Sequence, residues 1–357
     1  MIATEEKKIE IIKKDIRQLS REQLEAALVS LGEKKFRAVQ VYEWLWTKSA
    51  RDFNEMTNLS KALRQLLDTN FEIRPIVEDR VQVSSDGTIK GRFRLHDGHL
   101  IESVLIPVEA DGRFTACVSS QVGCSLTCTF CATGRMGRLR NLDASEIYDQ
   151  VVAVNRWSLE NFGQPLTNIV YMGMGEPLLT YPNVMRSIEI ISNVDGQGLG
   201  MSAKRITLST AGIAKMIRKL ADDNSKVNLA ISLHAADDEK RNTIMPINEH
   251  NNLEALVESL DYFYQKTRNR ITFEYITFQN FNDTLQDAQN LVKICRRIPA
   301  RVNIIEYNPI DNAPFLKSAD QNIDRFAQYL RDRDIAVTVR KSRGKDIDAA
   351  CGQLANK

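Results

Sequence analysis

The residues with the clearest capacity for chemistry are three cysteines, Cys124, Cys128 and Cys131, in the run Cys-Ser-Leu-Thr-Cys-Thr-Phe-Cys. A structural zinc ion closes its shell with four protein ligands, and an ordinary iron–sulfur cluster is also held by four cysteines. Only three cysteines are grouped here, and three thiolates on a four-iron cluster leave one iron open to bind another molecule. Buried cysteines, or a zinc site completed by a distant ligand, are the alternatives that the spacing leaves open.

Four segments of the chain must position these cysteines. Residues 1–75 are expected to form an N-terminal helical accessory domain, with a capping box in Ser-Arg-Glu-Gln at 20–23. Residues 76–112 are expected to form an antiparallel β-meander linker, because three Asp-Gly pairs, a strong hairpin signal, separate short β-prone runs. Residues 113–345 alternate strand and helix patterns, and residues 346–357 are expected to form a flexible tail that carries Cys351.

The strand–helix part predicts a parallel sheet, because consecutive βα units join parallel strands through crossover helices. One helix is expected at 143–160, opening with Asp-Ala-Ser-Glu as a capping box. Periodicity alone does not distinguish an open doubly wound sheet from a partial barrel. The expected strands are 113–119, 167–173, 204–209, 227–233, 271–277 and 301–307, with a further one at 335–340.

Polar residues follow several of these strands, at the end of a parallel barrel where ligands bind. The run Met-Gly-Met-Gly-Glu-Pro follows the second strand, where glycines allow backbone to approach a ligand and a carboxylate can accept a hydrogen bond. Each residue taken alone could be a cap or a satisfied core group, but their common position favours a binding site. The candidate binding residues are Gly175, Glu176, Ser209, Ser232, Leu233, His234 and Asn308.

The Cys-x3-Cys-x2-Cys spacing, with the aromatic Phe130 before its last cysteine, resembles the radical S-adenosylmethionine (SAM) superfamily. The resemblance implies a [4Fe-4S] cluster on Cys124, Cys128 and Cys131, whose open iron chelates the amino and carboxylate groups of SAM. An electron from the cluster would then cleave SAM to methionine and a 5′-deoxyadenosyl radical. The resemblance also implies a partial (β/α)6 barrel. It therefore decides between the barrel and the open doubly wound sheet, which periodicity alone does not distinguish.

Two further cysteines make the resemblance closer. Cys117 lies in Ala-Cys-Val-Ser-Ser-Gln-Val-Gly-Cys and Cys351 in Asp-Ile-Asp-Ala-Ala-Cys-Gly-Gln-Leu, and both segments are similar to those of the bacterial dual-specificity adenine C2-methyltransferases of 23S ribosomal RNA and transfer RNA. The C2 carbon of adenine is electron-poor, so a direct polar transfer from SAM is unavailable. The family chemistry implies that one SAM methylates Cys351 and that a second SAM supplies the radical. Each turnover would therefore consume two molecules of SAM.

The same resemblance assigns the later steps. The methylene radical on Cys351 would add to C2, Glu102 would accept the C2 proton, and Cys117 would attack Cys351 to release product as a transient disulfide forms. A related enzyme that methylates C8 of adenine and confers antibiotic resistance is one alternative. A non-catalytic iron–sulfur RNA-binding protein is the other, but simple binding requires neither Cys117 nor Cys351.

Composition and charge agree with an RNA-modifying enzyme without requiring one. With 357 residues, 43% of them hydrophobic, the chain suits about two globular domains, and the charged N-terminus and absence of a long apolar run predict a cytoplasmic protein with no membrane segment. We also expect a monomer, 23S rRNA and tRNA as partners, and a low-potential electron donor such as flavodoxin or ferredoxin. The net charge of +2 is uninformative, but basic clusters lie beside cysteines: Arg135, Arg138 and Arg140, and Arg340, Lys341, Arg343 and Lys345.

Overall fold

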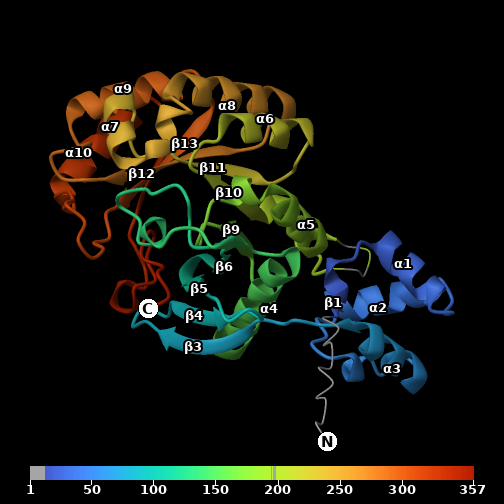
Figure 1. The fold of residues 1–357 in the computed structure, drawn as a ribbon. Coiled ribbons are helices and arrows are strands. Elements are labelled where there is room, and N and C mark those ends of the chain that lie inside the picture. Colours follow the sequence, from blue (N-terminus) through green and yellow to red (C-terminus); the bar gives the residue numbers. More distant parts are fainter. Residues whose placement is uncertain (1–12, 194, 196–197) are drawn as a thin grey trace, which may run out of the picture. The chain divides into compact units, whose positions relative to one another are not determined.

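The computed structural model describes residues 13–193, 195 and 198–357 (Figure 1). The chain divides into two compact units, one of Met1–Pro75 with Asn193–Gly200 and one of Ile76–Ser192 with Met201–Lys357. Among the described residues, no helix combines the length and the apolar character needed to cross a membrane.

The first unit is helical, as predicted. It contains α1 (Arg21–Ser30), α2 (Phe36–Trp46) and α3 (Lys61–Asn70), and the short parallel strands β1 (Lys14–Asp15) and β2 (Phe71–Glu72) pair beside them. The capping box is confirmed, because the Gln23 N–H donates to Ser20 Oγ at 3.2 Å and the Ser20 N–H donates to Gln23 Oε1 at 2.9 Å. The helices bury their apolar faces, including Leu24, Leu28, Val41, Leu45, Leu63 and Leu67.

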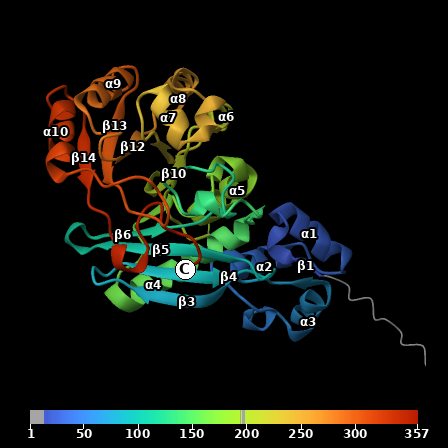
Figure 2. The same ribbon diagram turned by 60° about the vertical axis from the view of Figure 1, so that its left-hand side comes forward.

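The second unit is built on a ten-stranded sheet. Its parallel part runs in spatial order through β6 (Arg113–Cys117), β9 (Asn168–Tyr171), β10 (Ile206–Thr210), β11 (Asn228–Ser232), β12 (Ile271–Thr277), β13 (Ala300–Glu306) and β14 (Val337–Arg340). The intervening helices are α4 (Ala144–Phe162), α5 (Tyr181–Ser192), α6 (Ala214–Asp222), α7 (Asp238–Ile244), α8 (Leu253–Thr267), α9 (Leu285–Cys295) and α10 (Asp320–Arg331). In both views α6, α8 and α9 lie along one face of β11–β13 (Figure 2). This is the expected partial (β/α)6 barrel, with β14 as an additional strand.

An antiparallel meander extends the same sheet through β3 (Val77–Val83), β4 (Ile89–Arg94) and β5 (Leu100–Val108). The predicted Asp-Gly turns are confirmed at all three places, and their glycines Gly87, Gly98 and Gly112 have φ of 84°, 83° and 56°. Glycine adopts this left-handed region without a Cβ penalty. Because β5 pairs with β6, the meander is continuous with the barrel sheet.

The register of the meander sets which residues share a face. Lys90 pairs with Val104, and Val104 pairs with Cys117, so these three residues form one row across β4, β5 and β6. Side chains alternate between faces along a strand, and Glu102 therefore shares the face of this row. The opposite face is covered by α4, whose Trp157 ring stacks on Phe93 with centroids 5.6 Å apart.

Candidate active site

The predicted cluster ligands lie on one loop, residues 124–131, which we call the cysteine loop. Contacts with the end of β11 and the end of α7 hold this loop. The Thr129 N–H donates to the carbonyl oxygen of Ile244 at 3.1 Å, and the Phe130 ring packs edge-on against the His234 ring with centroids 4.8 Å apart. Elements more than 100 residues away in sequence thus fix the loop conformation.

The three thiols of the cysteine loop share one environment. Burial raises the pKa of Cys124 to about 11, and it raises the pKa values of Cys128 and Cys131 as well. The pKa of Cys128 is raised further by Cys131 and Cys124, because a thiolate disfavours a second negative charge nearby. The structure therefore brings the three predicted ligands within electrostatic reach of one another.

This donor set fits a four-iron cluster. Thiolates are the ligands that iron–sulfur clusters use, and all three cysteines are free of disulfides. Among the residues that the structure describes, no three His, Cys, Asp or Glu side chains form a group that could hold a single metal ion. The thiolates of a four-iron cluster each bind a different iron, so they need not converge on one point.

Glu176 is the predicted binding residue with the most unusual environment. Its Oε2 accepts from the Ala211 N–H at 2.8 Å and its Oε1 from the Leu178 N–H at 3.0 Å, which ties the end of β9 to the end of β10. Burial raises the pKa of Glu176 to about 7, although these hydrogen bonds lower it. The charge of Glu176 also influences Cys124 and Cys128, so it lies beside the cysteine loop.

Gly175 is required by packing of the protein itself. Its φ is 98°, and a Cβ at this position would lie 2.5 Å from the Cβ of Gln121. The sequence predicts that the glycines of this motif allow a ligand to approach the backbone. The structure shows a close approach, but the neighbour at Gly175 is the chain segment that leads into the cysteine loop.

The remaining candidate binding residues stand at the carboxyl ends of parallel strands, and therefore at one edge of the sheet. Ser209 lies in β10, Ser232 ends β11, Leu233 follows it, and Asn308 lies two residues beyond β13. Ser209, Leu233 and Asn308 are buried. Asn308 has a partner within the protein, since its Nδ2 donates to the carbonyl oxygen of Cys351 at 3.3 Å.

His234 is an anchored, neutral side chain. Its Nδ1 accepts from the Ile276 N–H at 3.1 Å, and its carbonyl oxygen accepts from the Asn282 Nδ2 at 2.6 Å. Burial lowers the pKa of His234 to about 3, and the nearby charge of Arg241 lowers it too. The imidazole is thus uncharged at neutral pH and supports Phe130 of the cysteine loop.

Cys117 and Cys351 interact electrostatically, although they lie 234 positions apart in sequence. Burial raises the pKa of Cys117 to about 12, with a further contribution from Cys351. Cys351 is exposed, yet surrounding protein atoms desolvate its thiolate and raise its pKa, and Cys131 contributes in the same direction. Cys351 therefore interacts with a cysteine of the cysteine loop and with Cys117, and neither Cys117 nor Cys351 is in a disulfide.

The tail that carries Cys351 has defined partners, in contrast to the flexible segment that the sequence suggested. On one side of Cys351, the Asp346 carboxylate accepts from Ser84 Oγ at 2.6 Å. On the other side, the Ala132 N–H donates to the Gly352 carbonyl oxygen at 2.7 Å. Thr133 Oγ1 donates to the Leu354 carbonyl oxygen at 2.6 Å. The tail thus bridges the meander and the residues directly after the cysteine loop, and both views place the C-terminus beside β4 (Figures 1 and 2).

Glu102, the predicted base, is completely buried under this tail. Its Oε2 accepts from the N–H groups of Ala355 and Asn356 at 2.9 and 3.0 Å, and its Oε1 lies 3.4 Å from Lys90 Nζ. Lys90 Nζ also reaches the carbonyl oxygen of Asp348 at 3.5 Å. In this arrangement the carboxylate stabilises the tail and is covered by it.

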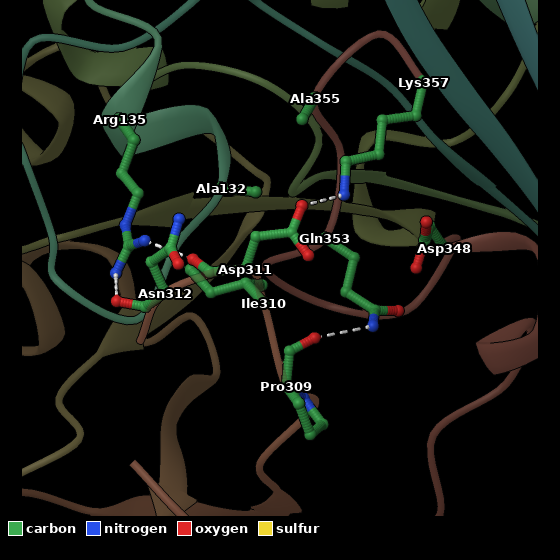
Figure 3. Close-up of a pocket in the computed structure, with 10 residues that line it drawn as sticks. All are labelled: Ala132, Arg135, Pro309, Ile310, Asp311, Asn312, Asp348, Gln353, Ala355 and Lys357. Atoms are coloured by element: carbon green, nitrogen blue, oxygen red, sulfur yellow. Dashed lines mark hydrogen bonds and ion pairs between the residues drawn. The ribbon is translucent and has the colours of Figure 1, made fainter. Parts of the chain in front are cut away.

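A cavity of about 290 Å³ opens beside the tail and the cysteine loop (Figure 3). Arg135 spans one wall and donates to the carbonyl oxygens of Asp311 and Asn312. Lys357 Nζ lies 2.6 Å from an Asp311 carboxylate oxygen, and Gln353 Nε2 donates to the Pro309 carbonyl oxygen at 3.1 Å. The residues that line the cavity are Ala132, Arg135, Pro309, Ile310, Asp311, Asn312, Asp348, Gln353, Ala355 and Lys357.

Two residues of this region were missed from the sequence. Lys90 stands in a strand of alternating polar and apolar residues, and nothing local distinguishes it from a solvated lysine. Arg241 lies in the charged run Asp-Asp-Glu-Lys-Arg, which is typical of a surface helix, yet its side chain is completely buried. Only contacts between distant segments place either residue in the site.

A partial (β/α)6 barrel with a three-cysteine loop at the carboxyl ends of its strands defines a radical SAM enzyme. The model of the Radical SAM superfamily matches residues 118–292, and that of the ribosomal RNA large subunit methyltransferase N-terminal domain matches residues 14–73. The chain belongs to the dual-specificity RNA methyltransferase RlmN family. It is therefore a SAM-dependent methyltransferase of the radical class.

Membership rests on relatives that match along nearly the whole chain. A probable dual-specificity RNA methyltransferase RlmN of Cytophaga hutchinsonii is 59% identical, covering 98% of this chain and 94% of the relative. The dual-specificity RNA methyltransferase RlmN of Campylobacter fetus is 43% identical, and the match covers 92% of this chain and 96% of that relative. A crystal structure of a radical SAM methyltransferase from Sphaerobacter thermophilus superimposes with a TM-score of 0.90 at 41% identity, covering 96% of this chain and all of that one.

Proposed function

We propose that this chain methylates C2 of adenine in 23S ribosomal RNA and in the anticodon loop of transfer RNA. The names of its relatives support RNA as the substrate class. The observation that carries the proposal is the position of Cys351, which is in electrostatic interaction with both Cys131 and Cys117. A methyl group relayed through a protein thiol needs such an arrangement of a carrier thiol, a resolving thiol and cluster ligands.

Cys124, Cys128 and Cys131 hold the cluster in this proposal, and the bound cluster supplies the electron that cleaves SAM. Glu176 contributes a carboxylate for the SAM ammonium group, since its oxygens each retain acceptor capacity beyond the one backbone N–H that they bind. Gly175, Ser209, Ser232, Leu233, His234 and Asn308 complete the edge where SAM binds.

Two thiols of the chain act at different steps of the methyl transfer. Cys351 carries the methyl-derived carbon to adenine, and Cys117 then attacks the sulfur of Cys351. The bond from that sulfur to the transferred carbon breaks, its electron pair stays on the carbon, a proton completes the methyl group, and a disulfide forms. A dithiol reductant must restore both thiols before another turnover.

Glu102 accepts the C2 proton in this scheme, and the unpaired electron of the radical adduct would return to the oxidised cluster before Cys117 attacks. Because its Oε2 already binds the N–H groups of Ala355 and Asn356, the tail must move before the carboxylate can meet a substrate. The residues that hold the tail are therefore part of the catalytic cycle. Movement of the tail also changes the position of Cys351, which lies on the same segment.

RNA contact is proposed for the basic residues that precede the tail. Lys341 is exposed and Arg343 is half-buried, whereas Lys345 pairs with Glu306 and Arg340 lies 3.7 Å from a Glu274 oxygen. The two residues without a carboxylate partner among the described residues, Lys341 and Arg343, are the better phosphate contacts. We further propose a monomeric, cytoplasmic enzyme that receives electrons from a low-potential donor such as flavodoxin or ferredoxin.

Anaerobic reconstitution followed by nucleoside analysis of treated rRNA and tRNA tests the proposal. We expect 2-methyladenosine in both, whereas 8-methyladenosine would identify the antibiotic-resistance activity instead. A Cys117→Ala variant should accumulate a nuclease-sensitive protein–RNA adduct at Cys351, and Cys351→Ala should form neither adduct nor product. Normal turnover by Cys117→Ala would contradict the assigned division of labour.

A further inference from the structure

Arg241 is a buried cation that makes no direct ion pair with a carboxylate of the described residues, although the charge of Asp238 on the same helix acts on it. The Arg241 side chain is completely inaccessible, in α7, whose last residue Ile244 accepts from the Thr129 N–H of the cysteine loop. Its guanidinium donates to the carbonyl oxygens of Leu233 at 3.1 Å, Ala211 at 2.6 Å and Ser232 at 3.3 Å, and to Asn248 Oδ1 at 2.6 Å. All four acceptors are neutral, and within residues 13–193, 195 and 198–357 no carboxylate forms an ion pair with it.

Such an arrangement is costly unless another negative charge balances it. Removing a charged group from water is unfavourable even after the surrounding protein relaxes. Burial lowers the pKa of Arg241 to about 10, so the guanidinium stays protonated at neutral pH, and the thiolate of Cys128 raises that pKa. Two contacts place this guanidinium beside the cysteine loop: Arg241 donates to Leu233, whose neighbour His234 packs on Phe130, and Ile244, which ends the same helix, accepts from the Thr129 N–H. The charge of Asp238 acts on Arg241 as well, but the Asp238 carboxylate accepts from Asn248 and not from the guanidinium. A cluster bound by the three thiolates of the cysteine loop carries net negative charge.

We propose that Arg241 is a positioning residue whose charge balances the thiolate-bound cluster and raises its reduction potential. One-electron reduction makes the cluster more negative, so a nearby buried cation stabilises the reduced form more than the oxidised form. The same guanidinium fixes the carbonyl groups at the ends of β10 and β11, next to the proposed SAM site. This inference rests on the proposed assignment of the cluster to Cys124, Cys128 and Cys131.

The test compares charge and shape at this position in the full-length protein reconstituted with iron and sulfide. Arg241→Gln removes the charge and keeps hydrogen-bonding capacity, and Arg241→Lys keeps the charge. A double variant, Asp238→Asn with Asn248→Asp, exchanges a carboxylate and an amide that are hydrogen-bonded to each other at 2.8 Å. It leaves the net charge and Arg241 unchanged but places a carboxylate against the guanidinium. Arg135→Gln is the control, because this arginine also acts electrostatically on a predicted cluster ligand, Cys131, but its side chain is exposed.

The readout is the midpoint potential of the cluster, from a redox titration followed by electron paramagnetic resonance without SAM. At a fixed poise, Arg241→Gln and the double variant should lower the ratio of reduced to oxidised cluster about tenfold, which corresponds to about 59 mV for one electron. Arg241→Lys should stay close to wild type, and Arg135→Gln should shift less than Arg241→Gln. Iron content and thermal unfolding of the same samples identify a variant that fails to fold, and the double variant then decides.

An unchanged potential in a folded Arg241→Gln or double variant with full iron content would overturn the role of Arg241. A potential in Arg241→Lys as low as in Arg241→Gln would show that geometry, not charge, matters, and would also overturn it. A wild-type protein that assembles no four-iron cluster would instead refute the proposed function itself, and the inference with it.

Discussion

The buried pair of Lys90 and Glu102 offers a quantitative test of how the tail is held. In a Lys90→Met variant, shape is nearly conserved, but the Glu102 carboxylate loses its cationic partner at 3.4 Å in a place that solvent does not reach. Breaking a buried ion pair by removing one partner destabilises a protein by about 3–5 kcal/mol. Because two tail N–H groups still solvate Glu102, we expect the lower end of this range.

The molecule has a local way to relieve this penalty. Hydrogen bonds to charged groups contribute about 1.5–3 kcal/mol each, so the two bonds from Ala355 and Asn356 contribute about 3–6 kcal/mol. That amount is similar to the penalty, and release of residues 355–356 would let water reach the carboxylate. A loss of about 3 kcal/mol should increase opening of the tail about 100-fold, since each 1.4 kcal/mol is a factor of ten.

Hydrogen–deuterium exchange of the C-terminal peptide measures this opening, and urea unfolding measures global stability in parallel. Arg94→Met is a matched control, because Arg94 lies on β4 like Lys90 and pairs with Asp79 of β3, but its side chain is exposed. We expect faster tail exchange in Lys90→Met and no change in the control. Unchanged exchange together with an unchanged unfolding midpoint in Lys90→Met would show that the ion pair does not hold the tail.

Three further outcomes are expected. Cys128→Ala should abolish the brown absorbance and SAM cleavage, because two cysteines of the loop cannot replace the third; a variant that kept both would contradict the cluster assignment. Replacing Lys341 and Arg343 with Gln should reduce the log–log salt dependence of RNA binding by roughly 0.7 for each lost single-strand phosphate contact, and an unchanged slope would mean that neither contacts phosphate. Contacts with Lys317, Lys345 and the Ser342 N–H lower the pKa of Glu306 to about 2, so its contribution to stability is present above pH 4.5 and is lost as pH falls through 2. Glu306→Gln should therefore lower the melting temperature at pH 7, with a difference that shrinks below pH 4.5; a difference that persists at pH 2 would exclude this linkage.

Local patterns were sufficient to predict most of the second unit's sheet. The strand expected at 271–277 is β12, Ile271–Thr277, and each Asp-Gly pair of the meander is a turn. These features depend on alternation and on glycine conformation, which a short window of sequence contains. The three-cysteine spacing likewise lies within eight residues, so the ligand set was visible in the sequence.

The supports of the site were not predictable from such windows. The hydrogen bond from Asn356 to Glu102 joins residues 254 positions apart, and its donor is a backbone N–H that any residue could supply. Arg241 becomes a buried residue only because carbonyl groups from two strand ends converge on it. The reacting groups can thus be recognised in the sequence from their residue types. The residues that hold them in place cannot, because their roles depend on contacts between distant segments.

The continuity of the meander with the barrel makes strand length as important as residue identity. Glu102 lies on β5 between the turn at Gly98 and the row of Lys90, Val104 and Cys117. A one-residue insertion in β5 after Glu102 would turn this carboxylate to the opposite face, towards Trp157, while Cys117 stayed in place. Hairpin tips at Gly87 and Gly98 can lengthen without that effect. Natural variants of this sheet should therefore differ in length at its turns and keep a fixed count of residues between Glu102 and Val104.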